Sequence, residues 1–212
     1  MSEILSVLSA SRPVMSVVTV DTVAEAVPLA RALVAGGLPA IEVTLRTAAG
    51  IEAIRAIAGE VEGAIVGAGT VLTPADMAAA EKAGARFAVS PGATAALLAA
   101  GRDSAMPYLP AVASASELMT GLEAGYVAFK LFPATIVGGV PWLKAMGAVF
   151  PKVRFCPTGG IDLKSAPDFL ALPNVVCVGG SWTAPRALVA AGDFDRIGEL
   201  AREALAALGP SA

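Results

Sequence analysis

A lysine inside an apolar segment is the feature of this sequence that most directly suggests chemistry. Lys130 stands in YVAFKLF, whereas the other lysines lie beside polar neighbours in predicted helices or loops. Burial of a charged, unpaired lysine is costly, so desolvation favours the neutral amine, which is the nucleophilic form. The alternative is a lysine at a strand edge whose ammonium group extends into solvent. We predict that Lys130 forms a Schiff base with a carbonyl substrate.

A carboxylate interrupts a second apolar segment, AIEVTL at residues 40–45. If the strand continues, Glu42, Thr44 and Arg46 share one face, because side chains alternate along a strand. A carboxylate in an apolar strand needs a partner, and either Arg46 or Lys130 can supply it. We predict that Glu42 transfers protons and that Arg46 binds a substrate carboxylate in bidentate fashion. The alternative is a structural ion pair of Glu42 with one of these two cations.

Histidine is absent from the 212 residues, and only two cysteines are present. This composition removes the usual zinc ligand, the usual general base and the Ser–His and Cys–His pairs. Cys156 and Cys177 lie 21 positions apart, each inside an apolar run, which indicates buried thiols rather than metal ligands. We therefore expect an enzyme that uses neither a metal nor another cofactor.

Charge and hydropathy exclude several classes of partner. The net charge is −3 and no basic cluster is present, so we expect no nucleic-acid partner. No apolar run reaches about 18 residues, and MSEILSVLSA lacks a cationic start, so a cytoplasmic protein without a membrane contact is expected. Charged residues make up only 16% of the chain. Either another subunit covers part of the surface, or the chain simply exposes many alanines.

The elements that must position these residues alternate between short apolar segments and helical stretches rich in alanine and leucine. The apolar segments begin 20 to 27 residues apart, at 15–20, 40–45, 64–70, 85–90, 106–112, 126–132, 153–159 and 175–181. Eight strand–helix units predict an α/β fold, a (β/α)8 TIM barrel in a single domain over residues 1–212. The alternative, an open doubly wound sheet, lacks its usual GxGxxG motif here. An extra N-terminal helix at residues 3–9 is expected to cover the bottom of the barrel.

Three glycine motifs follow predicted strands, and in such barrels the active site lies at the carboxyl ends of the strands. They are GAGT at 67–70, PTGG at 157–160 and VGGSW at 178–182. The hydroxyl of Thr70 can donate to a substrate carboxylate, and glycine lets a ligand approach the backbone closely. The two later motifs follow the seventh and eighth strands, where these barrels usually bind phosphate. Each motif can also be a tight turn without a ligand.

These groups together suggest one reaction. A neutral lysine attacks a ketone, and the resulting iminium accepts electrons when the neighbouring carbon–carbon bond breaks. Glu42 assists loss of water and then takes the proton of the C4 hydroxyl, while Arg46 and Thr70 hold the carboxylate. The sequence therefore predicts a class I aldolase that cleaves a 2-keto acid on Lys130 and releases pyruvate.

Eight stretches resemble one known family: VPLARALVAGG, IEVTLRT, IVGAGTVL, SPG, SELM, FKLFPA, VRFCPTGGI and GGSW. The chain resembles the bacterial 2-dehydro-3-deoxy-phosphogluconate (KDPG) aldolases, which often also act as 4-hydroxy-2-oxoglutarate (KHG) aldolases. The likeness runs from about Pro13 to Ala207. It implies a small TIM barrel that assembles as a homotrimer. It also implies a lyase of the Entner–Doudoroff pathway that yields pyruvate with glyceraldehyde 3-phosphate or glyoxylate.

The resemblance also implies the roles of single residues. The Schiff-base lysine of FKxFPA falls on Lys130, and the acid/base glutamate of EVTLRT falls on Glu42. Arg46 and Thr70 contact the pyruvyl carboxylate, and Thr158 lies close to them. The remaining implied residues hold the phosphate or line the pocket: Gly159, Gly160, Gly180 and Ser181 for the phosphate, and Pro91 and Phe132 for the wall.

Three positions depart from the family pattern. Ser16 stands where relatives commonly have a second proline, Ala111 replaces a glycine, and Leu131 fills the variable position of FKxFPA. None of these removes a predicted catalytic group, so they bear on which aldehyde fits. Two other functions stay open at this point. A phosphosugar isomerase or epimerase would not need a lysine within a strand, and a non-catalytic metabolite-binding barrel would tolerate loss of Lys130 or Glu42.

Overall fold

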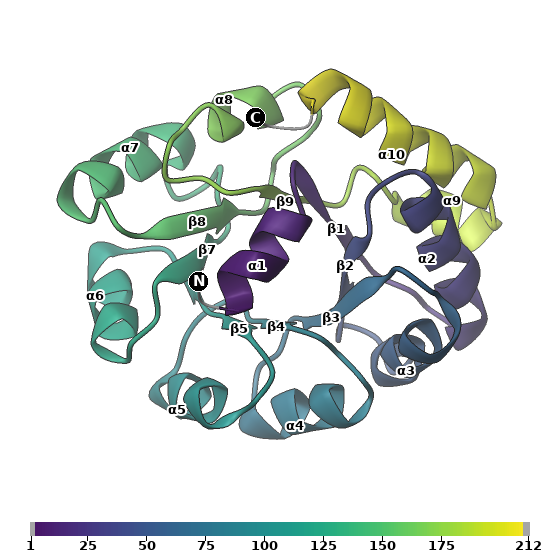
Figure 1. The fold of residues 1–212 in the computed structure, drawn as a ribbon, viewed down its shortest axis with the longest axis horizontal. Coiled ribbons are helices and arrows are strands. Elements are labelled where there is room, and N and C mark those ends of the chain that lie inside the picture. Colours follow the sequence, from purple (N-terminus) through teal and green to yellow (C-terminus); the bar gives the residue numbers. More distant parts are fainter. Residues whose placement is uncertain (1–2, 210–212) are drawn as a thin grey trace.

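The computed structural model describes residues 3–209, which form a ring of parallel strands surrounded by helices (Figure 1). The ends of the predicted domain, residues 1–2 and 210–212, lie outside the described residues. The strands are β1 Val14–Val18, β2 Ala40–Thr44, β3 Ile65–Gly69, β4 Ala88–Val89, β5 Tyr108–Leu109, β6 Ala111–Val112, β7 Ala128–Leu131, β8 Arg154–Pro157 and β9 Val178–Gly180. The α-helices are α1 Glu3–Ala10, α2 Ala26–Ala35, α3 Gly50–Glu60, α4 Pro74–Lys82, α5 Ala95–Asp103, α6 Ala115–Glu123, α7 Gly139–Val149, α8 Ala166–Leu170, α9 Arg186–Ala191 and α10 Phe194–Leu208, and a 3₁₀ turn, η1 Val23–Glu25, precedes α2.

The strand order confirms the barrel. One run of hydrogen-bonded strands is β5-β4-β3-β2-β1-β9 and the other is β6-β7-β8, with parallel pairing throughout. Isolated parallel bridges, Phe155 to Val175 and Thr158 to Gly179, join β8 to the strand that ends in β9. The sheet therefore curls back on itself, which rules out the open doubly wound alternative.

The fifth predicted strand, 106–112, is divided in two at Pro110. Proline has no backbone N–H and cannot continue a hydrogen-bonded ladder on that side. Its carbonyl still accepts a hydrogen bond from the backbone N–H of Lys130 at 2.9 Å. The break therefore interrupts β5 and β6 while keeping β6 beside β7, the strand that carries the lysine.

The strands are mostly apolar because both of their faces are covered, as parallel sheets require. Every residue of β1, β2 and β7 is buried. Helix α1 crosses one end of the barrel (Figure 1), where Ile4 and Leu8 join an interior cluster with Met15 and Phe87. The prediction of a helix over the bottom of the barrel is confirmed, and α1 extends to Ala10.

Local signals in the sequence set where several helices begin. The hydroxyl of Thr73 accepts a hydrogen bond from the backbone N–H of Asp76 at 3.1 Å, and Pro74 occupies the first turn of α4. The hydroxyl of Ser114 accepts from the backbone N–H of Glu117 at 3.3 Å at the start of α6. Both are capping boxes, in which the acidic side chain also accepts from the cap's own N–H. These caps set the starts of α4, which follows β3, and of α6, which follows β6.

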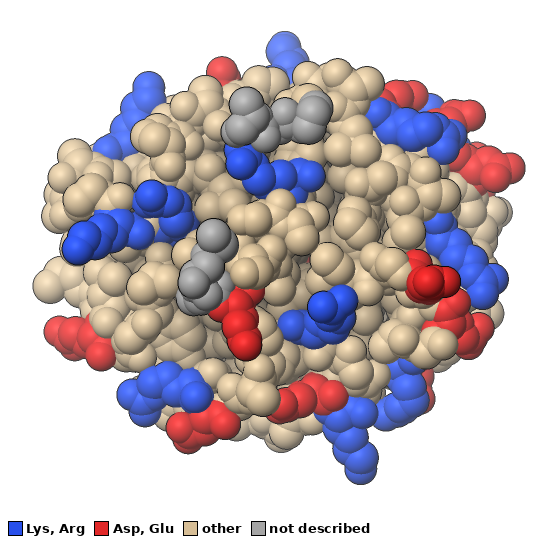
Figure 2. Space-filling view, viewed as in Figure 1, with Lys and Arg blue, Asp and Glu red and all other residues tan. Residues whose placement is uncertain are grey.

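The surface on the side of α1 carries interspersed charges. Figure 2 shows basic and acidic side chains interspersed over this face, at its rim and nearer its centre, without a continuous basic area. Within residues 3–209, no helix is long and apolar enough to cross a membrane. Over the same residues, no group of three His, Cys, Asp or Glu side chains could hold a metal ion. The charged side chains that are fully buried in the described part of the chain are Glu42 and Lys130.

Candidate active site

Glu42 and Lys130 meet inside the barrel. Glu42 comes from β2 and Lys130 from β7, strands that are not neighbours in the ring. Nζ of Lys130 donates to Oε1 of Glu42 at 3.1 Å, and the two residues are only 4% and 2% exposed. Lys130 is therefore not at a solvent-facing edge. Of the two cations considered as partners for Glu42, Lys130 is the one that contacts it in the structure.

Gly69 makes the space that the Glu42 carboxylate occupies. It pairs with Thr44 at the end of β3, one strand over from Glu42. A Cβ atom at position 69 would lie 2.3 Å from Oε1 of Glu42, a separation that real side chains do not reach. The sequence analysis assigned the glycines of GAGT to a turn or to the approach of a ligand. Gly69 has a more specific role, which is to let the carboxylate lie against the backbone of β3.

Thr70 follows directly and has an unusual backbone. Its φ is 59°, and it is the one residue other than glycine with a positive φ among residues 3–209. A β-branched residue in this region is strained by about 1–3 kcal/mol. Such strain gathers at functional sites, where the surrounding structure imposes it. The backbone of Thr70 is thus consistent with a side chain held in place for a ligand.

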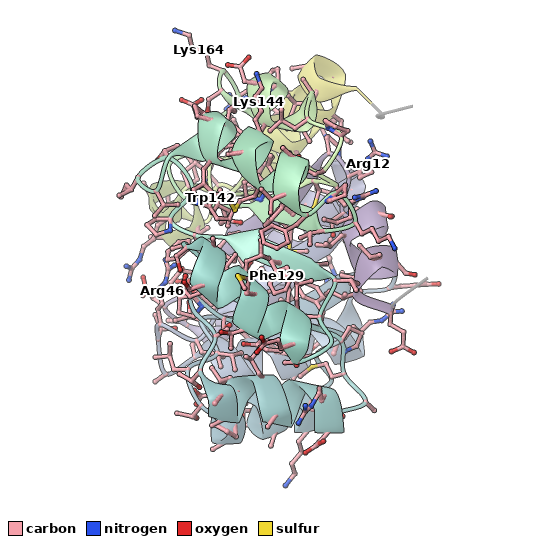
Figure 3. All side chains as sticks on the ribbon, turned by 90° about the vertical axis from the view of Figure 1, so that its left-hand side faces the viewer. Arg12, Arg46, Phe129, Trp142, Lys144 and Lys164 are labelled. Carbon is pink, nitrogen blue, oxygen red and sulfur yellow. The ribbon has the colours of Figure 1, made fainter. Side chains whose placement is uncertain are left out.

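Arg46 lies beyond the end of β2, which stops at Thr44. The argument that strand alternation carries through to Arg46 was therefore wrong, because the chain has already turned and the Arg46 side chain is exposed. Figure 3 shows Arg46 at the end of the barrel opposite α1 and Arg12. Thr44 itself faces Thr19, with 2.7 Å between the two hydroxyl oxygens. Arg46 is at the carboxyl ends of the strands, as predicted, but on a turn.

Phe132 and Pro91 have half-buried side chains at the same end of the barrel. Nζ of Lys130 lies 5.1 Å from the centre of the Phe132 ring, a cation–π distance. Pro91 follows the buried Ser90, whose hydroxyl donates to the Gly92 carbonyl at 2.5 Å and lies 2.6 Å from the Tyr108 hydroxyl. The structure thus brings Phe132 to the lysine, and the Ser90 hydroxyl ties the turn at Pro91 to Tyr108.

The two late glycine motifs lie side by side. Thr158 bridges to Gly179, and a Cβ at Gly179 would lie 2.2 Å from the Thr158 hydroxyl oxygen. Gly159 and Gly160 have φ values of 100° and 76°, which glycine adopts readily. The hydroxyl of Thr135 donates to the Gly159 carbonyl at 3.2 Å and ties this loop to the segment after β7. The two loops that were predicted to bind phosphate therefore lie next to each other in space.

A cavity of about 300 Å³ lies between the GGSW loop and the turn after β2. It contains two of the predicted residues, Arg46 and Ser181. Its full lining is Val17, Thr19, Arg46, Thr47, Ser181, Ala184, Pro185 and Arg186. The sequence analysis did not single out Arg186, whose place after a short loop gave no signal.

Ser16, one of the departures from the family pattern, is fully buried. Its hydroxyl accepts a hydrogen bond from the buried hydroxyl of Thr183 at 3.1 Å. Ser16 also pairs with Gly180 in the sheet. The serine therefore links β1 to the GGSW loop, a connection that a proline could not make with its side chain. Ala111, another departure, pairs with Lys130 in the sheet.

The fold is an α/β barrel, and the lysine of its buried Lys–Glu pair has the environment of a nucleophile. The chain matches the family of KDPG and KHG aldolases over residues 4–200. It is 53% identical over 192 residues to the 2-dehydro-3-deoxy-phosphogluconate aldolase of Pseudomonas aeruginosa, covering 91% of this chain and 87% of that one. It is 52% identical over 193 residues to the KHG/KDPG aldolase of Escherichia coli (strain K12), covering 91% of each.

Among solved structures, the chain is similar to KDPG aldolase from Legionella pneumophila, with a TM-score of 0.92 and 48% identity. The match covers 94% of this chain and 97% of that chain. That crystal contains pyruvate captured at low pH as a covalent carbinolamine intermediate. The chain described here belongs to the KDPG and KHG aldolase family.

Proposed function

We propose that this protein is a class I aldolase that cleaves KDPG to pyruvate and glyceraldehyde 3-phosphate, and KHG to pyruvate and glyoxylate. The observation that carries the proposal is the buried contact of 3.1 Å between Lys130 and Glu42. A lysine that attacks a carbonyl needs a neighbouring group to remove and return protons, and a carboxylate at this distance can do so. Relatives with about half of their residues identical are named KDPG aldolase and KHG/KDPG aldolase, which supports both substrates.

The proposed reaction begins when the ammonium group of Lys130 gives a proton to the carboxylate of Glu42, 3.1 Å away, and becomes a neutral amine. Nζ attacks the C2 ketone, and a proton passes from nitrogen to oxygen to give a carbinolamine. Glu42 then donates a proton to the departing hydroxyl group, and loss of water leaves an iminium. The carboxylate of Glu42 next takes the proton of the C4 hydroxyl. The C3–C4 bond breaks, the aldehyde leaves, and the electron pair moves into an enamine on Lys130.

The second half of the reaction restores the enzyme. Glu42 returns its proton to C3 of the enamine, which gives the pyruvyl iminium. Water adds to this iminium and gives a proton to the carboxylate of Glu42, the carbinolamine releases pyruvate, and Lys130 is again a free amine. The Phe132 ring, 5.1 Å from Nζ, is well placed to interact with the positive charge of both iminium intermediates.

The substrate's two ends are assigned to different loops. The pyruvyl carboxylate is assigned to Arg46 and Thr70, with Thr158 nearby. The phosphate is assigned to the backbone of Gly159, Gly160 and Gly180 and to the exposed hydroxyl of Ser181. Support comes from the adjacency of the two late loops and from the cavity that contains both Arg46 and Ser181.

We also propose that the protein is a cytoplasmic homotrimer. Ile136 is 81% exposed and Val149 is 64% exposed, so these large apolar residues are available for a contact with another subunit. Two free thiols, Cys156 and Cys177, fit a reducing compartment. Light scattering after size exclusion is expected to give about three times 21.1 kDa. A mass of one chain would contradict the trimer without affecting the proposed reaction.

The function is tested by pyruvate release. Purified protein is mixed with KDPG, with its galactonate epimer or with KHG, and pyruvate is followed by lactate dehydrogenase and NADH. We expect turnover of KDPG and KHG, and none from Lys130→Met. Pyruvate release by Lys130→Met at the rate of the parent protein, or none from any substrate with the parent, would contradict the proposal.

A further inference from the structure

The cavity beside Ser181 has a second arginine that the proposed reaction does not use. Arg186 stands at the start of α9 and lines the cavity together with Arg46 and Ser181. Arg46 takes part in none of the ion pairs found among residues 3–209, whereas Arg186 pairs with Asp21. Two guanidinium groups and a hydroxyl that share one small cavity form a typical setting for an anion.

Asp21 holds Arg186 in a defined orientation. Nε of Arg186 donates to Oδ2 of Asp21 at 3.2 Å, and Nη2 donates to Oδ1. This side-on contact uses two of the three guanidinium nitrogens, and Nη1 has no hydrogen bond to any of residues 3–209. An arginine has five N–H donors in a fixed planar arrangement. Donors on the far side of the guanidinium therefore stay available to a ligand.

The carboxylates near Arg186 belong to residues that do not line the cavity. Asp21 and Glu25 are the acidic groups that act on Arg186, and neither is among the residues that line the cavity. The Glu25 carboxylate accepts a hydrogen bond from the backbone N–H of Asp21 at 2.8 Å, so it is already engaged. The polar side chains that line the cavity are therefore cationic or hydroxyl groups, and no acidic residue is among them.

An exposed ion pair alone gives little reason for this arrangement. The side chains of Arg186 and Asp21 are 64% and 42% exposed, and such pairs stabilise a fold weakly. The pair joins the segment after β1 to the start of α9. It thereby holds the guanidinium group of Arg186 at the edge of the loop that contains Ser181. Orientation of a binding group explains that geometry better than stability does.

We propose that Arg186, oriented by Asp21, binds the terminal phosphate of the substrate and so determines the preference for phosphorylated over unphosphorylated keto acids. This inference rests on the proposed function and extends it to a residue outside the glycine loops. Phosphate at Ser181 would lie within the same cavity as Arg186, and a charge-assisted contact from the guanidinium would add to the backbone N–H groups. KHG has no phosphate, and its distal carboxylate at C5 stands nearer to the reacting carbons than the phosphate on C6 of KDPG, so KHG gains less from Arg186.

The test compares KM for KDPG and KHG in four proteins: the parent, Arg186→Ala, Arg186→Lys and the control Arg31→Ala. Arg31 is an exposed arginine on α2, so its loss changes the net charge equally without touching this cavity. We expect Arg186→Ala to raise KM for KDPG about tenfold, the usual scale for one solvent-exposed charge-assisted contact. Its kcat and its KM for KHG should change less than about twofold. Arg186→Lys keeps the charge, so its KM for KDPG should lie between the values of the parent and of Arg186→Ala.

The outcomes separate this inference from the proposed function. Suppose that the parent cleaves KDPG but that Arg186→Ala leaves KM for KDPG unchanged, or raises KM equally for KDPG and KHG. The proposed role of Arg186 would then be wrong, while the aldolase assignment would stand. An equal rise of KM for KDPG in Arg31→Ala would assign the effect to net charge and overturn the inference. Calorimetric titration with inorganic phosphate tests the site independently of turnover. We expect Arg186→Ala to weaken this binding, and equal binding by parent and variant would contradict the site.

Discussion

Glu42 and Lys130 are 88 positions apart in the chain, yet Nζ of Lys130 donates to Oε1 of Glu42 at 3.1 Å inside the barrel. Both groups are almost fully buried, so neither can replace its partner by contact with water. Removal of one partner from such a pair leaves an uncompensated charge, which is costly. The barrel thus combines a nucleophile and a proton-transfer group that would each be unfavourable alone.

Glu42→Gln should separate chemistry from folding. Glutamine keeps an oxygen that can accept the hydrogen bond from Lys130, so the protein should still fold, but it cannot take up a proton. We expect kcat to fall roughly 10²–10⁴-fold, the usual scale for loss of a general base. Thermal unfolding followed by circular dichroism checks the fold, and Glu52→Gln on the exposed face of α3 is the matched control. Turnover close to that of the control would contradict the role of Glu42.

Gly69→Ala should disturb the same carboxylate from the other side. The added Cβ would lie 2.3 Å from Oε1 of Glu42, so the carboxylate must move. A displacement of this kind is expected to lower kcat about 10²-fold. Gly59→Ala is the control, because its Cβ would meet nothing within 4 Å. Equal turnover in the two variants would show that the position of the carboxylate has little effect on the reaction.

Tyr108 should make stability depend on alkaline pH. Burial raises the pKa of Tyr108 to about 12, although its hydrogen bond with Ser90 acts in the opposite direction. The unfolded value is about 10. Because folding favours the neutral phenol, this contribution to stability is complete below pH 10 and is lost as the pH rises from about 10 to about 12.

Tyr108→Phe removes the titrating group and measures that contribution. At pH 8 the variant should be less stable by about 1 kcal/mol, since it loses the hydrogen bond with Ser90. The difference between parent and variant in urea unfolding should shrink as the pH approaches 11. A difference that stays constant between pH 8 and pH 11 would contradict the expected titration.

Much of the fold could be predicted from the spacing of apolar segments, because each strand–helix unit repeats the same local pattern. The burial of Lys130 followed in the same way from its apolar neighbours. The division of the fifth strand was missed, although Pro110 was the signal for it, since a proline cannot donate to a sheet ladder. The end of β2 at Thr44 was also missed, and with it the turn that carries Arg46.

The partners within the site could not be predicted from residue types alone. The choice between Arg46 and Lys130 as the partner of Glu42 depends on how the barrel closes, which no local pattern encodes. The same holds for the space that Gly69 gives to Glu42 and for the hydrogen bond between Ser16 and Thr183, residues 167 positions apart. Arg186 was missed for the same reason, because its partner Asp21 is 165 positions away.

The most direct measurement is the site of covalent attachment. The protein is incubated with pyruvate, reduced with borohydride and digested, and the mass of each lysine-containing peptide is determined. The account predicts one reduced pyruvyl group, on the peptide that contains Lys130 and on no other, with none in Lys130→Met. An adduct on a different lysine, or no adduct in the parent protein, would contradict it.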